Sequence, residues 1–324
     1  MPKGDKNKGV HVIMLSNSLS TYNKKGLPDI RAVLKNYPFV DHLEGNSLER
    51  LYEQLKNFKG TSPQLLILNG GDGTIHSALT FLMNNKIFKT LPPIAILGGG
   101  RTNMIAKDLK TGEKASQALE KILECLSDEW CPTRTEERSL IKIDFGNGKT
   151  QYGMFFGGTG MVHVIRHCTQ TVYKLGIKGR GAQIITVVAY FMSAIFSAKK
   201  PGDLAYSPPL TLRFDGNEKR EGNFACLVTT SLHYLVFGSK APQVPGKIPF
   251  LTLGPGFWPL LVAFTRGVLG TIENVKTNGV RLDYIKKVEI GGGYPFTLDG
   301  EIIENGEDTI TVSVTKPIKF VSFI

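Results

Sequence analysis

Residues 68–79 read LNGGDGTIHSAL, and this stretch decides the fold that the sequence predicts. It begins at the end of an apolar run of strand length, residues 65–68, and leads into a segment whose apolar residues have the spacing of one helix face. Three glycines and one acid, Asp72, lie at the junction. A strand that gives way to a helix through glycines is typical of the carboxyl edge of a parallel sheet, where open α/β folds bind their ligands.

The first part of the chain alternates between short apolar runs and amphipathic stretches. The apolar runs predict buried strands, and stretches with apolar residues three and four apart predict helices. Near-continuous apolar strands that alternate with helices indicate a parallel sheet covered on both faces. The expected strands are residues 12–15, 39–43, 65–68 and 94–97, and the expected helices are residues 27–34, 48–55, 75–83 and 115–126.

The pattern changes after about residue 135. Short runs of alternating polarity, such as residues 210–214 and 309–314, are separated by the turn pairs Asp215-Gly216, Asp299-Gly300 and Asn305-Gly306. This pattern predicts a mainly antiparallel β domain, interrupted by a helical segment near residues 161–198 and an apolar stretch near residues 256–270. We therefore expect two domains, residues 1–132 and 133–324, with a boundary near Cys131-Pro132 and a last strand that could pack back on the first domain.

The chain has 324 residues, of which 41% are hydrophobic and 21% charged, and its net charge is +11. This surplus favours an anionic partner, such as phosphate groups, nucleic acid or an acidic membrane surface. The four cysteines form no CxxC pair, so we expect reduced thiols and a cytoplasmic protein. The start, MPKGDKNKGV, lacks the apolar core of an export signal. Residues 182–198 carry no charge, but they are short for a membrane span of ~20 residues and favour a buried helix.

The glycine cluster at residues 70–73 has two interpretations. Glycines let the backbone approach a ligand closely, and the unpaired N–H groups of a helix start attract phosphate. Asp72 fits a phosphate site if a divalent cation lies between them, or if its carboxylate accepts a proton from a nucleophile. The alternative is a tight strand-to-helix turn with Asp72 near the N-cap. The cluster is neither a Walker loop nor the Rossmann fingerprint, because GxxxxGK[ST] is absent and no GxGxxG opens this helix.

NGGDGT, residues 69–74, resembles the nucleotide loop of the diacylglycerol kinase catalytic family, which includes bacterial lipid kinases, sphingosine kinases and ceramide kinases. The likeness extends along most of the chain in the same order. Asn17 and Ser20 stand where the family has NPxSG. GGGRTNMIA, residues 98–106, stands where it has a glycine-rich PxGTxND-type loop. GGTG, residues 157–160, resembles the glycine turn that opens the second domain, and DGE, residues 299–301, resembles a late family motif.

The resemblance implies an α/β nucleotide-binding domain with a parallel sheet, followed by a mainly antiparallel β-sandwich domain for the lipid substrate. It also implies ATP and Mg²⁺ as cofactors. Asp72, Asp299 and Glu301 then stand at catalytic positions, with Asp299 as the base for the lipid hydroxyl and Asp72 and Glu301 as metal ligands. The residues that the resemblance places around the nucleotide are Asn17, Ser20, Asn69, Gly70, Gly71, Gly73, Thr74, Gly100, Arg101, Thr102 and Asn103. From the residues alone, Asp299-Gly300 is also an ordinary hairpin turn signal.

The chain departs from the family pattern at several positions. Met104 replaces the acid of the family's ND pair, so a cation site would rely on Asp72, Glu301, water and phosphate oxygens. Val162 stands near a position where many members carry an acid. Arg101 replaces a small residue, and it either stabilises phosphate charge directly or is a solvated loop cation.

We therefore expect an ATP-dependent lipid kinase that phosphorylates the primary hydroxyl of a lipid such as diacylglycerol or ceramide. NAD kinase has a similar loop, but GGGRTNM is not the NxGxLGF-like segment expected after it. A non-catalytic lipid- or nucleotide-binding relative is another alternative, because Met104 is unusual. Scattered Lys and Arg residues without a recognised motif argue against nucleic acid as a partner.

GFWPLLVAFTRGVL, residues 256–269, has few polar residues. Such a stretch usually lies in the core, but with a lipid substrate it could form an acyl-chain entrance or enter the membrane interface. Together with the basic surplus, it favours a cytoplasmic protein in peripheral contact with the anionic inner face of the membrane. The sequence does not fix the acceptor lipid, the number of metal ions or whether the chain forms a homodimer.

Overall fold

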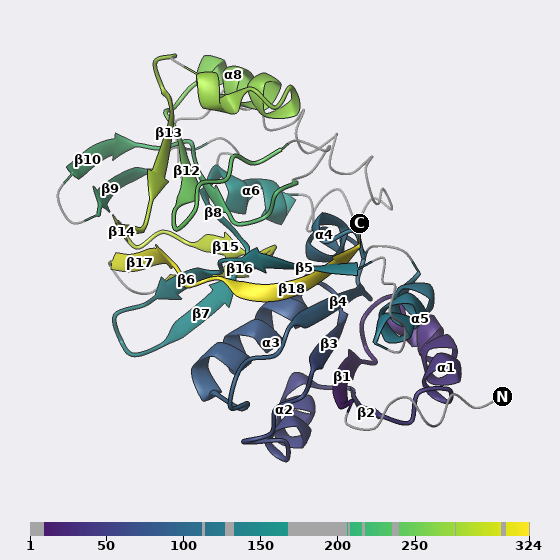
Figure 1. The fold of residues 1–324 in the computed structure, drawn as a ribbon. Coiled ribbons are helices and arrows are strands. Elements are labelled where there is room, and N and C mark those ends of the chain that lie inside the picture. The colour runs from purple at the N-terminus through teal and green to yellow at the C-terminus, as the bar shows by residue number, and fades with distance from the viewer. Residues whose placement is uncertain are drawn as a thin grey trace. The chain divides into compact units, whose positions relative to one another are not determined.

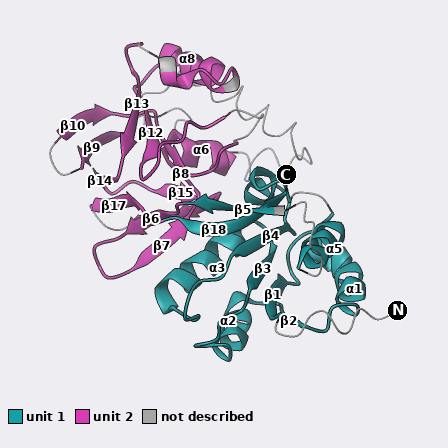
Figure 2. Cartoon of the chain, viewed as in Figure 1, with its two compact units in different colours: residues 1–138, 317–324 teal, residues 139–316 magenta. Residues whose placement is uncertain are grey.

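The computed structural model describes residues 10–111, 114–126, 133–167, 206, 208–215, 218–234, 240–275, 277–305 and 309–323. The chain forms two compact units, residues 1–138 together with 317–324, and residues 139–316 (Figure 2). The C-terminal residues therefore belong to the same unit as the N-terminal ones. The expected boundary at Cys131-Pro132 lies outside the described residues.

The first unit contains a six-stranded sheet. Its strands are β1 (Val12–Asn17), β2 (Val40–Gly45), β3 (Leu65–Gly70), β4 (Ile94–Gly98), β5 (Thr133–Arg138) and β18 (Ile318–Phe323). Their order in the sheet is β2-β1-β3-β4-β18-β5. Neighbouring strands run parallel except for β5, which pairs antiparallel with β18. The expected parallel sheet is therefore confirmed, with one antiparallel strand at its edge.

Helices cover both faces of this sheet, and this explains why the central strands are apolar along their whole length. The helices are α1 (Asn23–Leu34), α2 (Leu48–Lys56), α3 (Asp72–Asn85), α4 (Met104–Asp108) and α5 (Ala115–Cys125). Helices α1 and α5 contact each other and share a buried cluster with Val12, Met14 and Ile67. Helices α2 and α3 contact each other and lie on the opposite side (Figure 1). Every residue of β3 is buried, so each of its side chains packs under one of these two layers.

The second unit contains two six-stranded sheets. The strands of one sheet, in spatial order, are β10 (Glu218–Asn223), β9 (Pro209–Phe214), β14 (Lys287–Gly291), β17 (Thr309–Val314), β6 (Ile141–Asp144) and β7 (Thr150–Gly153). Those of the other are β13 (Val280–Ile285), β12 (Ile248–Leu253), β11 (Cys226–Thr230), β8 (Phe155–Thr159), β15 (Phe296–Leu298) and β16 (Glu301–Ile303). Among these described strands, neighbours in both sheets pair antiparallel.

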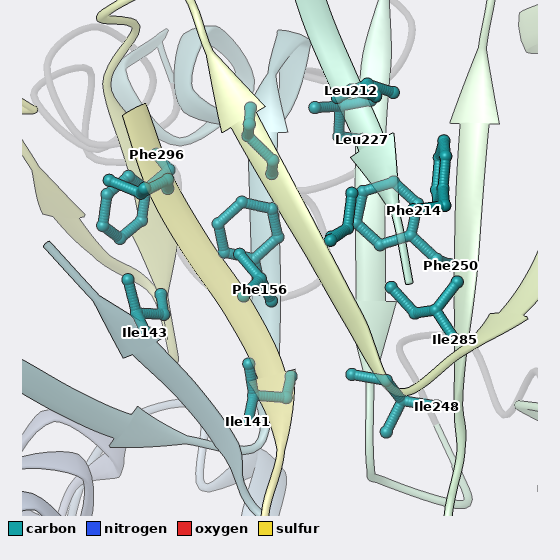
Figure 3. Close-up of a cluster of buried hydrophobic side chains, with 14 of the residues drawn as sticks. Ile141, Ile143, Phe156, Leu212, Phe214, Leu227, Ile248, Phe250, Ile285 and Phe296 are labelled. Carbon is teal, nitrogen blue, oxygen red and sulfur yellow. The ribbon is translucent and has the colours of Figure 1, made fainter. Parts of the chain in front are cut away.

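The two sheets of the second unit enclose a shared apolar core (Figure 3). Alternate side chains point into it: in β9, Leu210, Leu212 and Phe214 are buried, whereas the residues between them are partly or fully exposed. This alternation follows from the pleat of a strand. Phe156 from β8 and Phe296 from β15 contribute to the same core from the facing sheet. The predicted fold class, an α/β domain followed by an antiparallel β-sandwich, is thereby confirmed.

The described part of the second unit also has helices. These are α6 (Gly160–His167), α8 (Phe257–Val268) and the short 3-10 helix η3 (Ile272–Asn274). The apolar stretch expected near residues 256–270 is therefore a helix, α8. Residues 182–198 lie outside the described residues. Within the part of the chain that is described, no helix has both the length and the apolar character needed to cross a bilayer.

The expectation of four reduced thiols is wrong for one cysteine. Cys125, the last residue of α5, is disulfide-bonded. Cys226 is a buried free thiol whose pKa is raised to about 12 by burial, so this thiol stays protonated. Cys131 and Cys168 lie outside the described residues. The sequence could not show this, because a disulfide depends on the distance between two cysteines in space and not on their spacing along the chain.

Arg220 links the two sheets of the second unit through its guanidinium group. It lies on β10 in one sheet, and its Nη1 and Nη2 donate to the carboxylate of Asp283 on β13 in the other, at 2.6 and 3.1 Å. The guanidinium also lies over Phe214, 4.1 Å from the ring centroid. The side chains of Arg220 and Asp283 are only 15% and 20% exposed. Solvent therefore screens this pair less than it screens a surface ion pair.

Replacement of Arg220 by Lys is expected to lower the free energy of unfolding by about 1–2 kcal/mol, as measured by urea denaturation. A lysine ammonium cannot bind both oxygens of Asp283 and stack flat on Phe214. The matched control is Lys219→Gln on the same strand, where Lys219 forms an exposed ion pair with Glu221. The control should change the free energy by less than about 0.5 kcal/mol. Equal losses in the two variants would contradict a link between the sheets through Arg220.

Candidate functional site

The glycine-rich stretch lies at the carboxyl edge of the first sheet. Strand β3 ends at Gly70, Gly71 is the N-cap of α3 with an extended backbone, and Asp72 is the first helical residue. The neighbouring strands β1 and β4 end at Asn17 and Gly98, and the strand register pairs Gly70 with Gly98. Three loops therefore leave the sheet side by side at this edge.

The loops after β3 and β4 approach each other so closely that a side chain has no room at Gly100 and little room at Gly71. A Cβ on Gly100 would lie 2.5 Å from the Cα of Gly71, and a Cβ on Gly71 would lie 3.2 Å from the Cα of Gly100. Gly99 also donates its backbone N–H to the carbonyl of Gly70 at 2.8 Å. Backbone atoms cannot rotate away from a contact as a flexible side chain can, so this approach requires glycine.

Polar side chains hold the same turn from the neighbouring loops. Asn17 Nδ2 donates to Thr74 Oγ1 at 2.9 Å, and Ser20 Oγ accepts the backbone N–H of the N-cap glycine at 3.4 Å. Asn103 precedes α4 with a left-handed backbone (φ 49°), and its Oδ1 accepts the N–H of Gly100 at 2.7 Å. Residues that the family resemblance assigns to the nucleotide site are thus brought together within the first unit.

Asn23 also shapes this edge, although the sequence did not single it out. It begins α1 and is 2% exposed, and its Nδ2 donates to the backbone carbonyls of Asn17 and Asn69 at 2.9 and 3.2 Å. A Cβ on Gly99 would lie only 2.7 Å from Asn23 Oδ1, so glycine at that position leaves room for the amide. The sequence signal for this contact is the run of three glycines at residues 98–100. The close approach to Gly71 requires glycine only at Gly100, and Gly99 makes room for Asn23.

Asp72 is half-buried beside the first turn of α4, and its Oδ1 accepts the backbone N–H of Ile105 at 3.3 Å. Burial raises the pKa of the Asp72 carboxyl, while backbone hydrogen bonds from Met104 and Ile105 and the charge of Lys107 oppose the shift. Met104, which replaces the family's acid, therefore directs a backbone N–H toward this carboxylate and adds no second negative charge.

The other predicted residues of the first unit differ in their access to solvent. Arg101 and Thr102 are exposed, so a ligand could reach both side chains. Asn69 is fully buried, and its Nδ2 donates to Ser16 Oγ at 3.1 Å. Asn69 therefore supports the strand ends from inside the unit, and its side chain does not face solvent. Gly73 lies in the first turn of α3.

The DGE motif of the second unit forms a hairpin turn. Asp299 and Gly300 have φ angles of 49° and 89°, and Leu298 at the end of β15 pairs with Glu301 at the start of β16. Two consecutive positive φ angles define a type I′ turn, which the pair Asp-Gly favours. The turn signal in the sequence therefore describes this backbone correctly, and any chemistry of the motif takes place on the turn.

The carboxylate of Asp299 is held by backbone groups at the start of β8. Asp299 is 4% exposed, and its Oδ1 accepts the N–H groups of Met154 and Phe155 at 3.0 and 2.8 Å. Its own N–H donates to the carbonyl of Phe155 at 2.8 Å. A Cβ on Gly153 would lie 2.5 Å from Asp299 Oδ2, so glycine there leaves room for the carboxylate. Asp299 thus ties the turn to β8, and its role as a base stays a prediction.

Metal binding was assigned by resemblance to Asp72 and Glu301. Glu301 is exposed, although partial burial of its carboxyl raises its pKa. Among the described residues, no three acidic, histidine or cysteine side chains gather into a metal cluster. A single carboxylate beside a phosphate site still fits Mg²⁺, because this ion usually binds one or two carboxylates and completes its shell with phosphate oxygens and water. In the first unit, Asp72 is a single carboxylate beside the glycine cluster.

Comparison with known proteins gives a family and a fold. Residues 10–129 match the model of the diacylglycerol kinase catalytic domain. Two solved structures of candidate diacylglycerol kinases from Bacillus anthracis strain Sterne are similar to this chain, with sequence identities of 18% and 17% and TM-scores of 0.63 and 0.64. Each alignment covers 94% of this chain and 94% of the solved one. A third structure, of a diacylglycerol kinase from the same organism, is 14% identical with a TM-score of 0.60 and covers 97% of this chain and 96% of that one. No curated protein matches the sequence.

The first unit is an α/β domain whose sheet has a glycine-rich carboxyl edge. Residues 10–129 within it match the model of the diacylglycerol kinase catalytic domain, so this part of the chain is similar to that family. The resemblance carried by the motifs is therefore confirmed. At these low identities the solved structures show the fold alone, and that shared fold extends over both units.

Gly100→Ala is expected to lower the free energy of unfolding by about 1–3 kcal/mol, because the added methyl group would overlap backbone atoms of Gly71. Gly26→Ala in α1 is the matched control, since no heavy atom lies within 4 Å of its Cβ position. The control should gain about 0.5–1 kcal/mol from helix propensity. Thermal and urea denaturation measure both changes, and a neutral Gly100→Ala variant would contradict the close approach of the two loops.

Asp72→Asn is expected to raise the free energy of unfolding at neutral pH. Folding raises the pKa of this carboxyl above its ordinary value of 3.8. Asp72 therefore contributes stability below pH 3.8, where it is protonated in both states, and this contribution is lost as the pH rises through the raised pKa of the folded chain. Asparagine keeps an oxygen to accept the N–H of Ile105 and carries no charge. Urea denaturation between about pH 4 and pH 7 should show the advantage of the variant growing with pH. A constant difference would contradict the assigned shift.

Proposed function

We propose that the chain is an ATP-dependent lipid kinase that phosphorylates the primary hydroxyl of a lipid such as diacylglycerol or ceramide. The observation that supports this most is the close approach of Gly71 and Gly100 at a sheet edge beside Asp72. Glycine at these positions lets phosphate oxygens come close to the backbone, and the first turn of α3 presents N–H groups beside it. The family match of residues 10–129 to a kinase catalytic domain supports the same conclusion.

In this proposal the phosphates of ATP bind the glycine cradle, defined as Gly70, Gly71, Gly73 and Gly100. Bound Mg²⁺ supplies positive charge that stabilises the phosphate oxygens during transfer. Asp72 is its proposed ligand in the first unit, and Glu301 is the second proposed metal ligand. Arg101, exposed on the same loop as Gly100, is proposed to stabilise phosphate charge. The hydrogen bonds of Asn17, Ser20 and Asn103 keep the cradle in shape.

Asp299 is the proposed acceptor of the proton from the lipid hydroxyl. Because its carboxylate also accepts two backbone N–H groups, substitution of Asp299 affects the turn as well as any proton transfer. Kinetics of an Asp299 variant must therefore be paired with a thermal melt. Asp72 is the better first target, because asparagine there keeps the acceptor for Ile105.

We also propose a cytoplasmic location with peripheral contact at the anionic inner face of the membrane. A long-chain lipid acceptor lies in a bilayer, so the protein must reach that surface to find it. The net charge of +11 supports attraction to anionic headgroups. Nucleic acid is not proposed as a partner, because the sequence carries no recognised motif for it.

Transfer of radiolabelled γ-phosphate tests the proposed function. The purified chain is incubated with labelled ATP, Mg²⁺ and, in separate reactions, diacylglycerol, ceramide or a sphingoid base in detergent micelles, or NAD in solution. We expect label in one of the lipids. Asp72→Asn should reduce turnover by at least about 10²-fold while remaining folded by circular dichroism.

Three other outcomes of this assay would change the proposed function or the proposed site. Label in NAD alone would replace the proposal with a NAD kinase. Binding of ATP without label in any acceptor would favour a non-catalytic relative. Full turnover by a folded Asp72→Asn variant would remove Asp72 from the catalytic site.

A further inference from the structure

Helix α8 of the second unit has an inner face that packs on the sandwich. Leu260 and Ala263 are 6% and 7% exposed, and they belong to a buried cluster with Cys226, Leu253 and Val280. This cluster lies outside the shared core between the sheets, so α8 forms a separate layer on the unit (Figure 1). The inner face therefore accounts for the attachment of α8 to the fold.

The outer face of α8 also carries exposed apolar side chains. Trp258 and Leu269, the C-cap residue, are 71% and 72% exposed, and Phe264 is 40% exposed. Helices α2 and α5 are different, because their exposed positions carry polar or charged residues. These are Glu49, Arg50, Glu53 and Lys56 in α2, and Gln117, Glu120, Lys121 and Glu124 in α5. The outer face of α8 is thus an exception among the amphipathic helices that the structure describes.

The few polar groups of α8 suit a surface of low polarity. The helix has no acidic residue. The hydroxyl of Thr265 donates to the backbone carbonyl of Leu261 at 2.8 Å, so this polar group has a partner within the helix itself. Arg266 is exposed near the C-terminal end, where a long cationic side chain can reach lipid phosphates while its stem lies along apolar groups.

We propose that α8 docks on the surface of a phospholipid bilayer that contains anionic lipids, with Trp258, Phe264 and Leu269 entering the boundary between headgroups and acyl chains. Tryptophan is favoured at that boundary, and helices that lie in it combine an apolar face with basic residues. The net charge of +11 and the acid-free helix complement anionic headgroups. A second copy of the chain is a poorer occupant, because three partly exposed side chains supply far less than the roughly 800 Å² per partner of a standard interface.

The docking of α8 deepens the proposed function and rests on it for its purpose, but it is measured without ATP. The chain has two tryptophans, so Trp130→Phe leaves Trp258 as the sole fluorescent indole. This protein is mixed with vesicles of phosphatidylcholine and phosphatidylglycerol at about 3:1. We expect a blue shift of Trp258 emission and quenching by lipids brominated on their acyl chains. Vesicles of phosphatidylcholine alone should bind several-fold more weakly.

Substitution gives the quantitative test. Trp258→Ser combined with Leu269→Ser, in the otherwise natural chain, should lower the vesicle partition coefficient by roughly tenfold or more in sedimentation assays. Tyr234→Ser is the matched control, because Tyr234 is an aromatic residue that is 43% exposed. It follows the C-terminal end of β11, whereas Cys226, which packs under α8, begins that strand. The control should bind vesicles like the natural chain. Circular dichroism confirms that each variant is folded.

Three results would overturn the docking of α8. The first is a Trp258 emission spectrum that vesicles do not change. The second is equal vesicle binding by the double variant and the natural chain. The third is a dimer of the natural chain that dissociates on substitution, together with no binding to vesicles. Failure of vesicle binding with phosphate transfer to micellar lipid intact would overturn this inference alone. Vesicle binding without any phosphate transfer would instead support the docking of α8 and overturn the proposed kinase activity.

Discussion

The close approach of two backbone segments, at Gly71 and Gly100, is the constraint on which the candidate site of the first unit depends. The pairing of β3 with β4 brings the segments together, and glycine is required because a methyl group on Gly100 would overlap the Cα of Gly71. Asn103 and Asn23 then fix the loops by donating to, or accepting from, backbone groups. The result is an edge of the sheet where the backbone segments at Gly71 and Gly100 lie against each other without side chains between them.

The second unit uses the same combination of a polar side chain and a neighbouring glycine. Asp299 accepts two backbone N–H groups from the start of β8, and Gly153 leaves the space that its carboxylate fills. A buried carboxylate with such partners stabilises the turn that presents Glu301. Asp72 differs, because burial raises its pKa and so disfavours the charged form on folding. A charged group that the fold does not favour is a frequent mark of a functional site.

Much of the fold could be predicted from the sequence because its strands and glycine turns follow local rules. The apolar run before Gly70 and the alternation in β9 each specify an element from a few neighbouring residues. The role of Asn23 could not be predicted, since it depends on carbonyls at the ends of two strands far apart in the chain. The type I′ turn at Asp299 was predictable from Asp-Gly, but the hydrogen bonds of its carboxylate to Met154 and Phe155 were not, because they join residues 145 and 144 positions apart.

The central claim is that the glycine cradle binds the phosphates of a nucleotide. Amide chemical shifts of the ¹⁵N-labelled chain, followed during titration with Mg²⁺ and a non-hydrolysable ATP analogue, test it most directly. We expect the largest shifts at the amides of Gly70, Gly71, Gly73 and Gly100, and we expect Gly100→Ala to weaken binding by tenfold or more, on the order of 1.4 kcal/mol. Saturable binding whose shifts lie away from these amides, or unchanged affinity in a folded Gly100→Ala variant, would contradict it.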